Sequence, residues 1–150
     1  EIAGEHGLAI TENQDIVYRE GPKPGEASAP LSPPRDAAWR EAIRPSESLL
    51  FRYSALIFNA HRIHYDRPYA VDHEGYGGLV VHGQLVATLL ADLARRKIGG
   101  RMTAFSFRAL RPILDTGTFT LCGVPSDDGA RLWAEDAAGG LAMEAKAAFG

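Results

Sequence analysis

The sequence contains a single cysteine, Cys122, which excludes an internal disulfide. It has no apolar run near the roughly twenty residues of a membrane-spanning helix, and no signal peptide is recognisable. No dense run of lysine and arginine occurs, and the net charge of -3 has the wrong sign for a polyanion-binding protein. We therefore expect a reduced, cytoplasmic protein that binds neither nucleic acid nor a membrane, with Cys122 as a buried filler residue.

The composition is that of an ordinary globular protein, with 45% apolar and 23% charged residues in 150. This length is sufficient for one domain with a real hydrophobic core. The chain starts at Glu1 without a methionine and enters strand-like sequence at once. We expect it to be a fragment or processed product of a longer protein.

A proline-rich stretch divides the sequence. Residues 21–36 contain five prolines and two glycines, which disfavour regular structure and favour an extended path. We predict a linker here and a compact domain at 37–150. Upstream, residues 1–20 contain the β-favouring run Asp15-Ile16-Val17-Tyr18 without a local partner, so we expect a strand that belongs to another unit.

Two helices are predicted at the start of the domain. Ser46 is a suitable N-cap for the first, with Glu47 in its first turn. Its apolar residues fall on one helical face: Leu49, Leu50, Tyr53, Leu56 and Ile57. The second helix runs from about His82 to Ile98, with basic residues near its C-terminal end and Gly99-Gly100 as its stop.

After the second helix, the hydrophobic period changes to two. Four strands are predicted, at Met102–Arg111, Thr116–Val124, Ala130–Asp136 and Leu141–Phe149, with turn signals between them. A long helix followed by strands joined as hairpins predicts an α+β fold with an antiparallel sheet. The long helix is apolar around much of its circumference, so we expect the sheet to wrap it.

The segment FNAHRIHYDRPYA, Phe58 to Ala70, holds two of the five histidines. Two histidines three residues apart, with Arg62 between them and no clear third ligand, make a poor zinc site, so we expect no metal. A solvated surface loop is the plain alternative. Because apolar residues bracket the segment, we instead expect its polar groups at the edge of the core, where burial tunes proton affinity.

A second segment, GYGGLVVHGQ from Gly75 to Gln84, places glycines before the long helix. The phosphate-loop pattern is absent. Glycines at a helix start let a ligand approach the first free N–H groups, whose partial positive charge can polarise a carbonyl. An ordinary glycine loop capped by His82 is the alternative.

Taken together, HRIHYDRPYA, GLVVHG and FSFRALRPI resemble the MaoC-like acyl dehydratases of the hotdog superfamily, which include the (R)-specific enoyl-CoA hydratases. The resemblance runs from about Leu49 to Phe149 and is greatest to the mesaconyl-C4-CoA (itaconyl-CoA) hydratase and 3-hydroxyacyl thioester dehydratase branch. It implies a hotdog fold, in which the sheet wraps the helix that begins at His82. Many members carry two hotdog units, and residues 1–20 are similar to the closing strand of an upstream unit.

The resemblance also implies a catalytic pair. The family has an aspartate and, five residues later, a histidine; these positions fall at Asn59 and His64. His64 matches, whereas an amide at Asn59 orients a water but transfers no proton. Asp66 is the nearest carboxylate and a candidate for orienting His64.

From these residues we predict reversible hydration of a 2-enoyl thioester without a cofactor. His64 would act as acid and base on a water held by Asn59, and the backbone N–H of Gly83, or of its neighbour at the helix N-terminus, would polarise the thioester carbonyl. Tyr65 and Tyr69 would shape the acyl pocket. Further substrate contacts are predicted at Arg67, Gly78 and His82, and Arg62, Arg67 or Arg108 would meet a CoA phosphate or a substrate carboxylate.

Two other functions share this fold. A hotdog thioesterase normally uses a carboxylate, which Asn59 disfavours, and a non-catalytic acyl-binding half is disfavoured by His64. We expect coenzyme A or an acyl carrier protein to deliver the substrate. Because hotdog sheets have edges that pair with a second unit, a homodimer or a double-hotdog pairing is expected.

Overall fold

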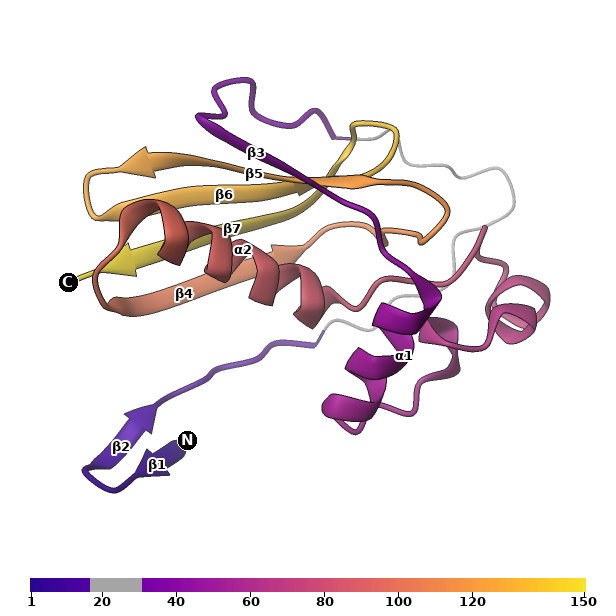
Figure 1. Cartoon of the computed structure of the whole chain (residues 1–150), viewed down its shortest axis with the longest axis horizontal. Helices are drawn as coiled ribbons and strands as arrows, with labels where there is room; N and C mark the ends of the chain where they lie inside the picture. The colour runs from indigo at the N-terminus through magenta and orange to yellow at the C-terminus, as the bar shows by residue number, and fades with distance from the viewer. Residues whose placement is uncertain (17–30) are drawn as a thin grey trace.

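A five-stranded antiparallel sheet and one long helix form the body of the protein. The computed structural model describes residues 1–16 and 31–150. The strand order is β3-β5-β6-β7-β4, and the strands are β3 Trp39–Ile43, β4 Met102–Ala109, β5 Phe119–Ser126, β6 Gly129–Glu135 and β7 Leu141–Phe149. Helix α2, Gly83–Ile98, lies across one face of the sheet (Figure 1). The predicted α+β fold is confirmed.

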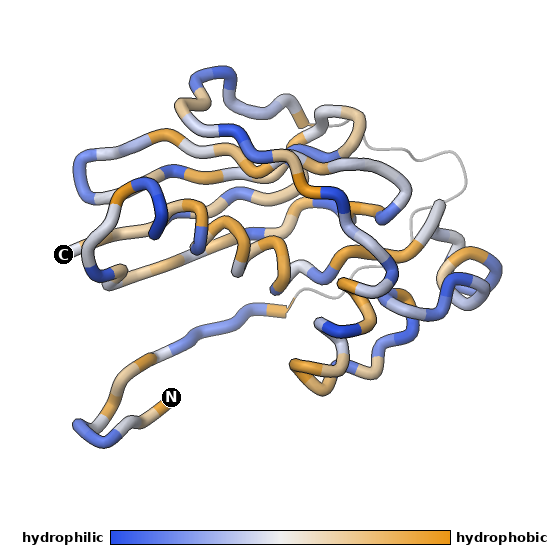
Figure 2. The backbone as a smooth tube through the Cα atoms, in the orientation of Figure 1, coloured by the Kyte–Doolittle hydropathy of each residue, from blue (hydrophilic) through white to orange (hydrophobic). Residues whose placement is uncertain are grey.

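Helix α2 forms where its sequence predicts. His82 is the residue before its first turn, and Gly99 ends it with φ 74°, a left-handed conformation that glycine adopts without strain. Apolar residues along the helix are buried against the sheet: Leu85, Val86, Leu90, Leu93 and Ala94. Figure 2 shows polar residues alternating with these along the helix, so only part of its surface contributes to the core.

The predicted strands are present with small changes at their ends, and β7 has the predicted bounds. Its alternation puts Met143 and Ala145 on the helix side and leaves Glu144 and Lys146 exposed. Strand β3 was missed. It is short, follows the proline-rich stretch and contains two charged residues, so its sequence gives little indication of a strand. It forms a strand because it pairs with β5.

Helix α1, Glu47–Leu56, begins after Ser46, whose hydroxyl accepts a hydrogen bond from the N–H of Leu49. The capping prediction is confirmed. The predicted apolar face is wrong at its C-terminal end: Leu50 is buried, but Leu56 is 75% and Ile57 37% exposed. The reason is position, because α1 lies beyond the end of α2 (Figure 1) and only its side with Leu50 and Ser54 is buried.

The N-terminal residues form a small hairpin of β1, Ile2–Gly4, and β2, Gly7–Ile10. Its apolar side chains are exposed. Asp15 and Ile16 are not in a strand, and Val17 and Tyr18 lie outside the described residues. The assignment of residues 1–20 to an upstream unit, and the division at 21–36 and 37–150, stay predictions.

The face of the sheet opposite α2 carries a second, smaller cluster around Cys122, Trp133 and Leu141. The end of the proline-rich stretch contacts this face: the carbonyl of Leu31 accepts from the N–H of Leu141, and Asp36 pairs with Arg131. Cys122 is fully buried, as predicted. Within residues 1–16 and 31–150, no helix combines the length and hydrophobicity needed to cross a bilayer.

Candidate active site

The end of α1 directs the chain into the histidine segment. Phe58 has φ 54°, and the N–H groups of Phe58 and Asn59 donate to the carbonyls of Ala55 and Ser54 at 3.3 and 2.9 Å. This is the Schellman pattern of a helix C-terminus, in which glycine is usual. A non-glycine residue there costs about 1 kcal/mol, and the resulting reversal carries the chain back toward the core.

His64 is buried, and it and its neighbour Ile63 each make one hydrogen bond with Val80. It ends the short 3-10 helix η1, Arg62–His64, whose Ile63 carbonyl accepts from the N–H of Val80 at 3.0 Å. The Nδ1 atom of His64 lies 2.7 Å from the carbonyl oxygen of Val80. A carbonyl only accepts, so Nδ1 carries the proton and Nε2 keeps its lone pair. Val80, rather than Asp66, therefore orients His64.

The surroundings of His64 keep it neutral. Burial lowers the pKa of His64 below the ordinary 6.5, against the opposing hydrogen bond to Val80, and the nearby His61 lowers it further. Among the described residues, Nε2 has no hydrogen-bond partner. At neutral pH, His64 is thus a base with a free lone pair.

His82 lies directly against His64. The two rings are stacked, with centroids 3.7 Å apart and an interplanar angle of 17°. Nε2 of His82 is 2.8 Å from the hydroxyl of Ser54, Tyr53 packs edge-on against its ring, and Nδ1 has no partner. Burial, with a smaller contribution from His64, lowers the pKa of His82 to about 4. His82 is therefore a second neutral imidazole.

The segment before α2 is fixed on its other side by the turn after β4. The N–H of Val81 donates to the carbonyl of Ile113, and the N–H of Asp115 donates to the carbonyl of Leu79. The side chain of Asp115 accepts from the N–H of Leu79 at 2.9 Å. Residues 79–81 thus connect His64 to the turn at 113–115.

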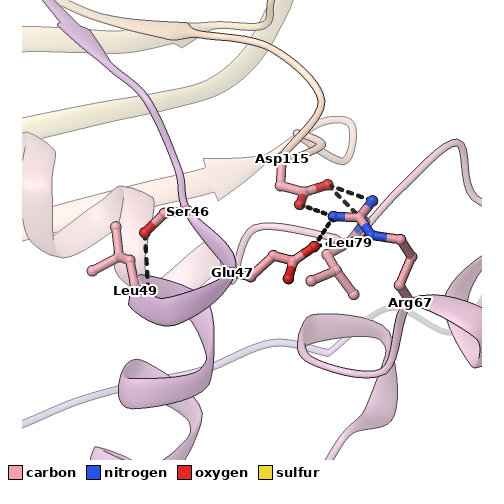
Figure 3. Close-up of polar contacts among 6 residues, drawn as sticks. All are labelled: Ser46, Glu47, Leu49, Arg67, Leu79 and Asp115. Atoms are coloured by element: carbon pink, nitrogen blue, oxygen red, sulfur yellow. Dashed lines mark hydrogen bonds and ion pairs between the residues drawn. The ribbon is translucent and has the colours of Figure 1, made fainter.

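Arg67 joins this turn to α1. Its guanidinium contacts Asp115 at 2.6 Å and Glu47 at 2.5 Å, so that one cation holds two carboxylates (Figure 3). A Cβ atom at Gly78 would lie 2.7 Å from Asp115 Oδ1, which explains the glycine. Arg67 and Gly78, both predicted to contact the substrate, are thus engaged in holding the loop, and their substrate contacts stay predictions.

A cavity of about 270 Å³ opens at His64. Its wall also includes Gly83, the first residue of α2. The remaining lining is mainly apolar and comes from the segment before α2, α2 itself, the end of β4 with its following turn, and β7: Val80, Val81, Val86, Ala109, Leu110, Arg111, Pro112, Ile113, Ala142 and Met143. A Cβ atom at Gly83 would lie 3.9 Å from Met143, so packing alone does not require this glycine.

Other predicted site residues lie outside this lining. Asn59 is half-buried, and its side-chain oxygen accepts from the N–H of His61 at 2.9 Å. Tyr65 donates to the carbonyl of Ala60, and Tyr69 donates to Glu74 beneath the guanidinium of Arg62. His82 is fully buried behind His64. Their proposed contacts with substrate or water stay predictions.

Sequence reasoning missed several residues of the site. Ser54 and Val80 are ordinary in sequence and acquire their roles only by contact with His82 and His64. Arg111 was part of the quoted FSFRALRPI segment, and alternation along the predicted strand Met102–Arg111 would have placed it on the side opposite Arg108. In the structure β4 ends at Ala109, so the position of Arg111 depends on the turn that follows.

Comparison with known proteins identifies the family. The family model described as hydroxyacyl-thioester dehydratase type 2 matches residues 1–115. The chain belongs to this dehydratase family. It is 49% identical over 145 residues to a mesaconyl-C(4)-CoA hydratase of Chloroflexus aurantiacus, covering 95% of this chain and 51% of that protein. It is 32% identical over 124 residues to the mitochondrial hydroxyacyl-thioester dehydratase type 2 of Schizosaccharomyces pombe, covering 79% of this chain and 40% of that protein.

Solved structures of dehydratases and hydratases share the fold. The (R)-hydratase of A. caviae gives a TM-score of 0.64 at 19% identity, over 73% of this chain and 89% of that chain. HtdX from Mycobacterium tuberculosis gives a TM-score of 0.66 at 24% identity, over 89% of this chain and 53% of that chain. The chain spans about half, or less, of the length of the relatives from Chloroflexus aurantiacus and Schizosaccharomyces pombe.

In the part of the chain that the structure describes, no three His, Cys, Asp or Glu side chains are grouped as metal ligands would be.

Proposed function

We propose that this member of the dehydratase family catalyses the reversible addition of water to a 2-enoyl thioester. The observation that carries the proposal is the position of His64: its Nδ1 is bound to Val80, and its side chain lines a cavity that also contains the first residue of α2. Hydration needs a base, an acid and a donor for the enolate oxygen. One imidazole and one helix N-terminus supply all three.

The proposed reaction uses the free nitrogen of His64. Nε2 takes a proton from water as the water oxygen bonds to the β-carbon, and the electron pair of the double bond moves toward the thioester oxygen. The N–H of Gly83 stabilises this enolate. The imidazolium then returns the proton to the α-carbon, so one water is added and His64 is restored. Asn59 remains the group proposed to hold the water.

Coenzyme A is the proposed carrier of the acyl group, with an acyl carrier protein as the alternative. The relative from Chloroflexus aurantiacus is named for a CoA thioester, whereas the type 2 dehydratases are named only for thioesters. The small, mainly apolar cavity favours a short acyl chain. We also infer a cytoplasmic location, which rests on the lone thiol Cys122.

We further propose that β4 pairs with a second hotdog unit. It is an edge strand of eight residues that pairs only with β7 among the described strands, and its Phe107 is 44% exposed. Long, exposed apolar edges are pairing sites. Replacing Phe107 with lysine should shift the protein toward monomer in light scattering; an unchanged mass would contradict the pairing.

A thioesterase is the other function for this fold, and one assay separates the two. The full-length protein is incubated with crotonyl-CoA and mesaconyl-C4-CoA, while enoyl absorbance and free thiol are followed. We expect absorbance to fall without thiol release. Thiol release without hydration would indicate a thioesterase, and neither signal would favour an acyl-binding half; both results would overturn the proposal.

A further inference from the structure

Among the described residues, Arg111 is the one permanently charged residue in the lining of the cavity at His64. It lies two residues after the end of β4, and its backbone N–H donates to the carbonyl of Ala142 at 3.3 Å. The guanidinium side chain is 38% exposed. A cation in a mainly apolar cavity is costly unless it has a partner.

A fixed carboxylate holds one edge of this guanidinium. Nε of Arg111 lies 3.3 Å from Oδ2 of Asp136, whose side chain is 12% exposed. The other oxygen of Asp136 accepts from the N–H groups of Ala138 and Gly140, at 2.9 and 2.8 Å, in the turn before β7. Asp136 is therefore anchored, and the two terminal nitrogens of Arg111 have no partner among the described residues.

We propose that Arg111 binds a carboxylate on the acyl group, so that the substrate is the monothioester of a short unsaturated dicarboxylic acid. This inference rests on the proposed function. Two terminal N–H groups of a guanidinium match the two oxygens of a carboxylate. An uncharged acyl chain would offer no acceptor to the two terminal nitrogens of the guanidinium on binding, which costs affinity.

The chemistry of such a substrate agrees with the wall of the cavity. In mesaconyl-C4-CoA, the free carboxylate is attached to the β-carbon, where water adds. A base and a cation must then lie close to the same carbon, and His64 and Arg111 line one small cavity. The water oxygen bonds to the β-carbon and its proton goes to the α-carbon through His64, while the carboxylate stays ionised on Arg111.

The other arginines considered for this role are engaged elsewhere. Arg67 holds Glu47 and Asp115, and Arg62 pairs with Asp66 at 2.8 Å. Arg108 lies opposite Glu144 in the register of β4 and β7, on the side of the sheet away from α2, and lines a separate groove there. None of the three lines the cavity at His64.

Arg101 supplies a control, since Arg101→Gln removes the same charge at an exposed position outside the lining of the cavity. The test measures kcat/KM of wild type, Arg111→Gln and Arg101→Gln with mesaconyl-C4-CoA and crotonyl-CoA. We expect Arg111→Gln to lower the value for mesaconyl-C4-CoA on the order of a hundredfold and for crotonyl-CoA less than about threefold. Arg101→Gln should change neither beyond that range. Circular dichroism and Tm verify that each variant is folded. Should Arg111→Gln disturb the turn, Arg111→Lys serves as the second variant: it keeps the positive charge and should retain part of the kcat/KM for mesaconyl-C4-CoA that Arg111→Gln loses.

The N-acetylcysteamine thioester of mesaconate, which lacks the CoA phosphates, distinguishes the two anions that Arg111 could meet. If Arg111 binds the acyl carboxylate, this thioester should suffer the same loss as mesaconyl-C4-CoA. A loss confined to both CoA thioesters would assign Arg111 to a CoA phosphate and overturn the inference. Hydration of crotonyl-CoA but not mesaconyl-C4-CoA by wild type would overturn it too, while leaving the proposed function intact; hydration of neither would instead refute the function.

Discussion

The two faces of the sheet each carry a buried polar cluster, and the two clusters differ in how completely their atoms are paired. On the side opposite α2, the buried carboxylate of Glu135 accepts from Arg40, the indole of Trp133 and the thiol of Cys122. On the α2 side, His64 and His82 stack, and each has a ring nitrogen without a partner among the described residues.

This difference separates a structural cluster from a chemical one. Buried polar groups are normally satisfied, and a group that is not requires an explanation. The Glu135 cluster is charged and its groups are hydrogen-bonded to one another, so it offers no free donor or acceptor to a substrate. The histidine cluster is neutral because burial lowers both pKa values, and His64 directs its side chain at a cavity. Incomplete pairing beside a cavity, rather than burial itself, indicates the site.

Removing the base should produce the largest effect. We expect His64→Ala to lower kcat about a thousandfold or more, because both proton transfers lose their group. Tm should change little beyond the loss of the bond to Val80. His61→Ala is the matched control, since His61 is exposed and packs edge-on against His64; it should retain activity within about threefold. An unaffected hydration rate in His64→Ala would refute the mechanism.

Breaking the other cluster should affect stability instead. Glu135→Gln removes a charge that accepts from Arg40 and Trp133, so urea unfolding should show a loss of about 1–3 kcal/mol. Activity per folded molecule should stay unchanged. Glu144→Gln, an exposed carboxylate of β7, is the control and should change stability by less than about 0.5 kcal/mol. A fall in kcat without loss of stability in Glu135→Gln would refute the assignment of the Glu135 cluster as structural.

Acid should act on the histidine cluster first. His64 must be neutral to act as base, and burial lowers its pKa below 6.5, so the acid midpoint of kcat/KM should lie below pH 6.5, with a fall of about tenfold per pH unit on its acid side. For His82, the unfolded chain binds a proton near pH 6.5 but the folded chain only near pH 4. Stability should thus be lost as pH falls through this window, by up to ~1.4 kcal/mol per pH unit. A midpoint of kcat/KM above pH 6.5 would contradict the burial of His64.

Much of the fold and part of the site followed from the sequence. Helix α2, the order of β5 to β7 and the choice of His64 rest on local signals, namely periodicity, a glycine stop and one family motif. What sequence reasoning missed is long-range. The tautomer of His64 depends on a carbonyl sixteen positions away, and Arg67 binds a carboxylate forty-eight positions away. Exposure of Leu56 likewise depends on where α1 lies relative to α2, which helical periodicity does not encode.

The smallest effect is expected at Cys122, a member of the paired cluster. Burial, the largest cause, and the neighbouring Glu135 raise the pKa of the thiol to about 12, so no thiolate forms at neutral pH. Cys122→Ala should therefore leave activity unchanged and cost only about 1 kcal/mol, from one lost contact and a small cavity. Native protein should react with a thiol reagent only as fast as it unfolds, whereas unfolded protein should react at once. Rapid labelling of the native protein, or loss of hydration after labelling, would show that the far side of the sheet is less closed than its hydrogen bonds indicate.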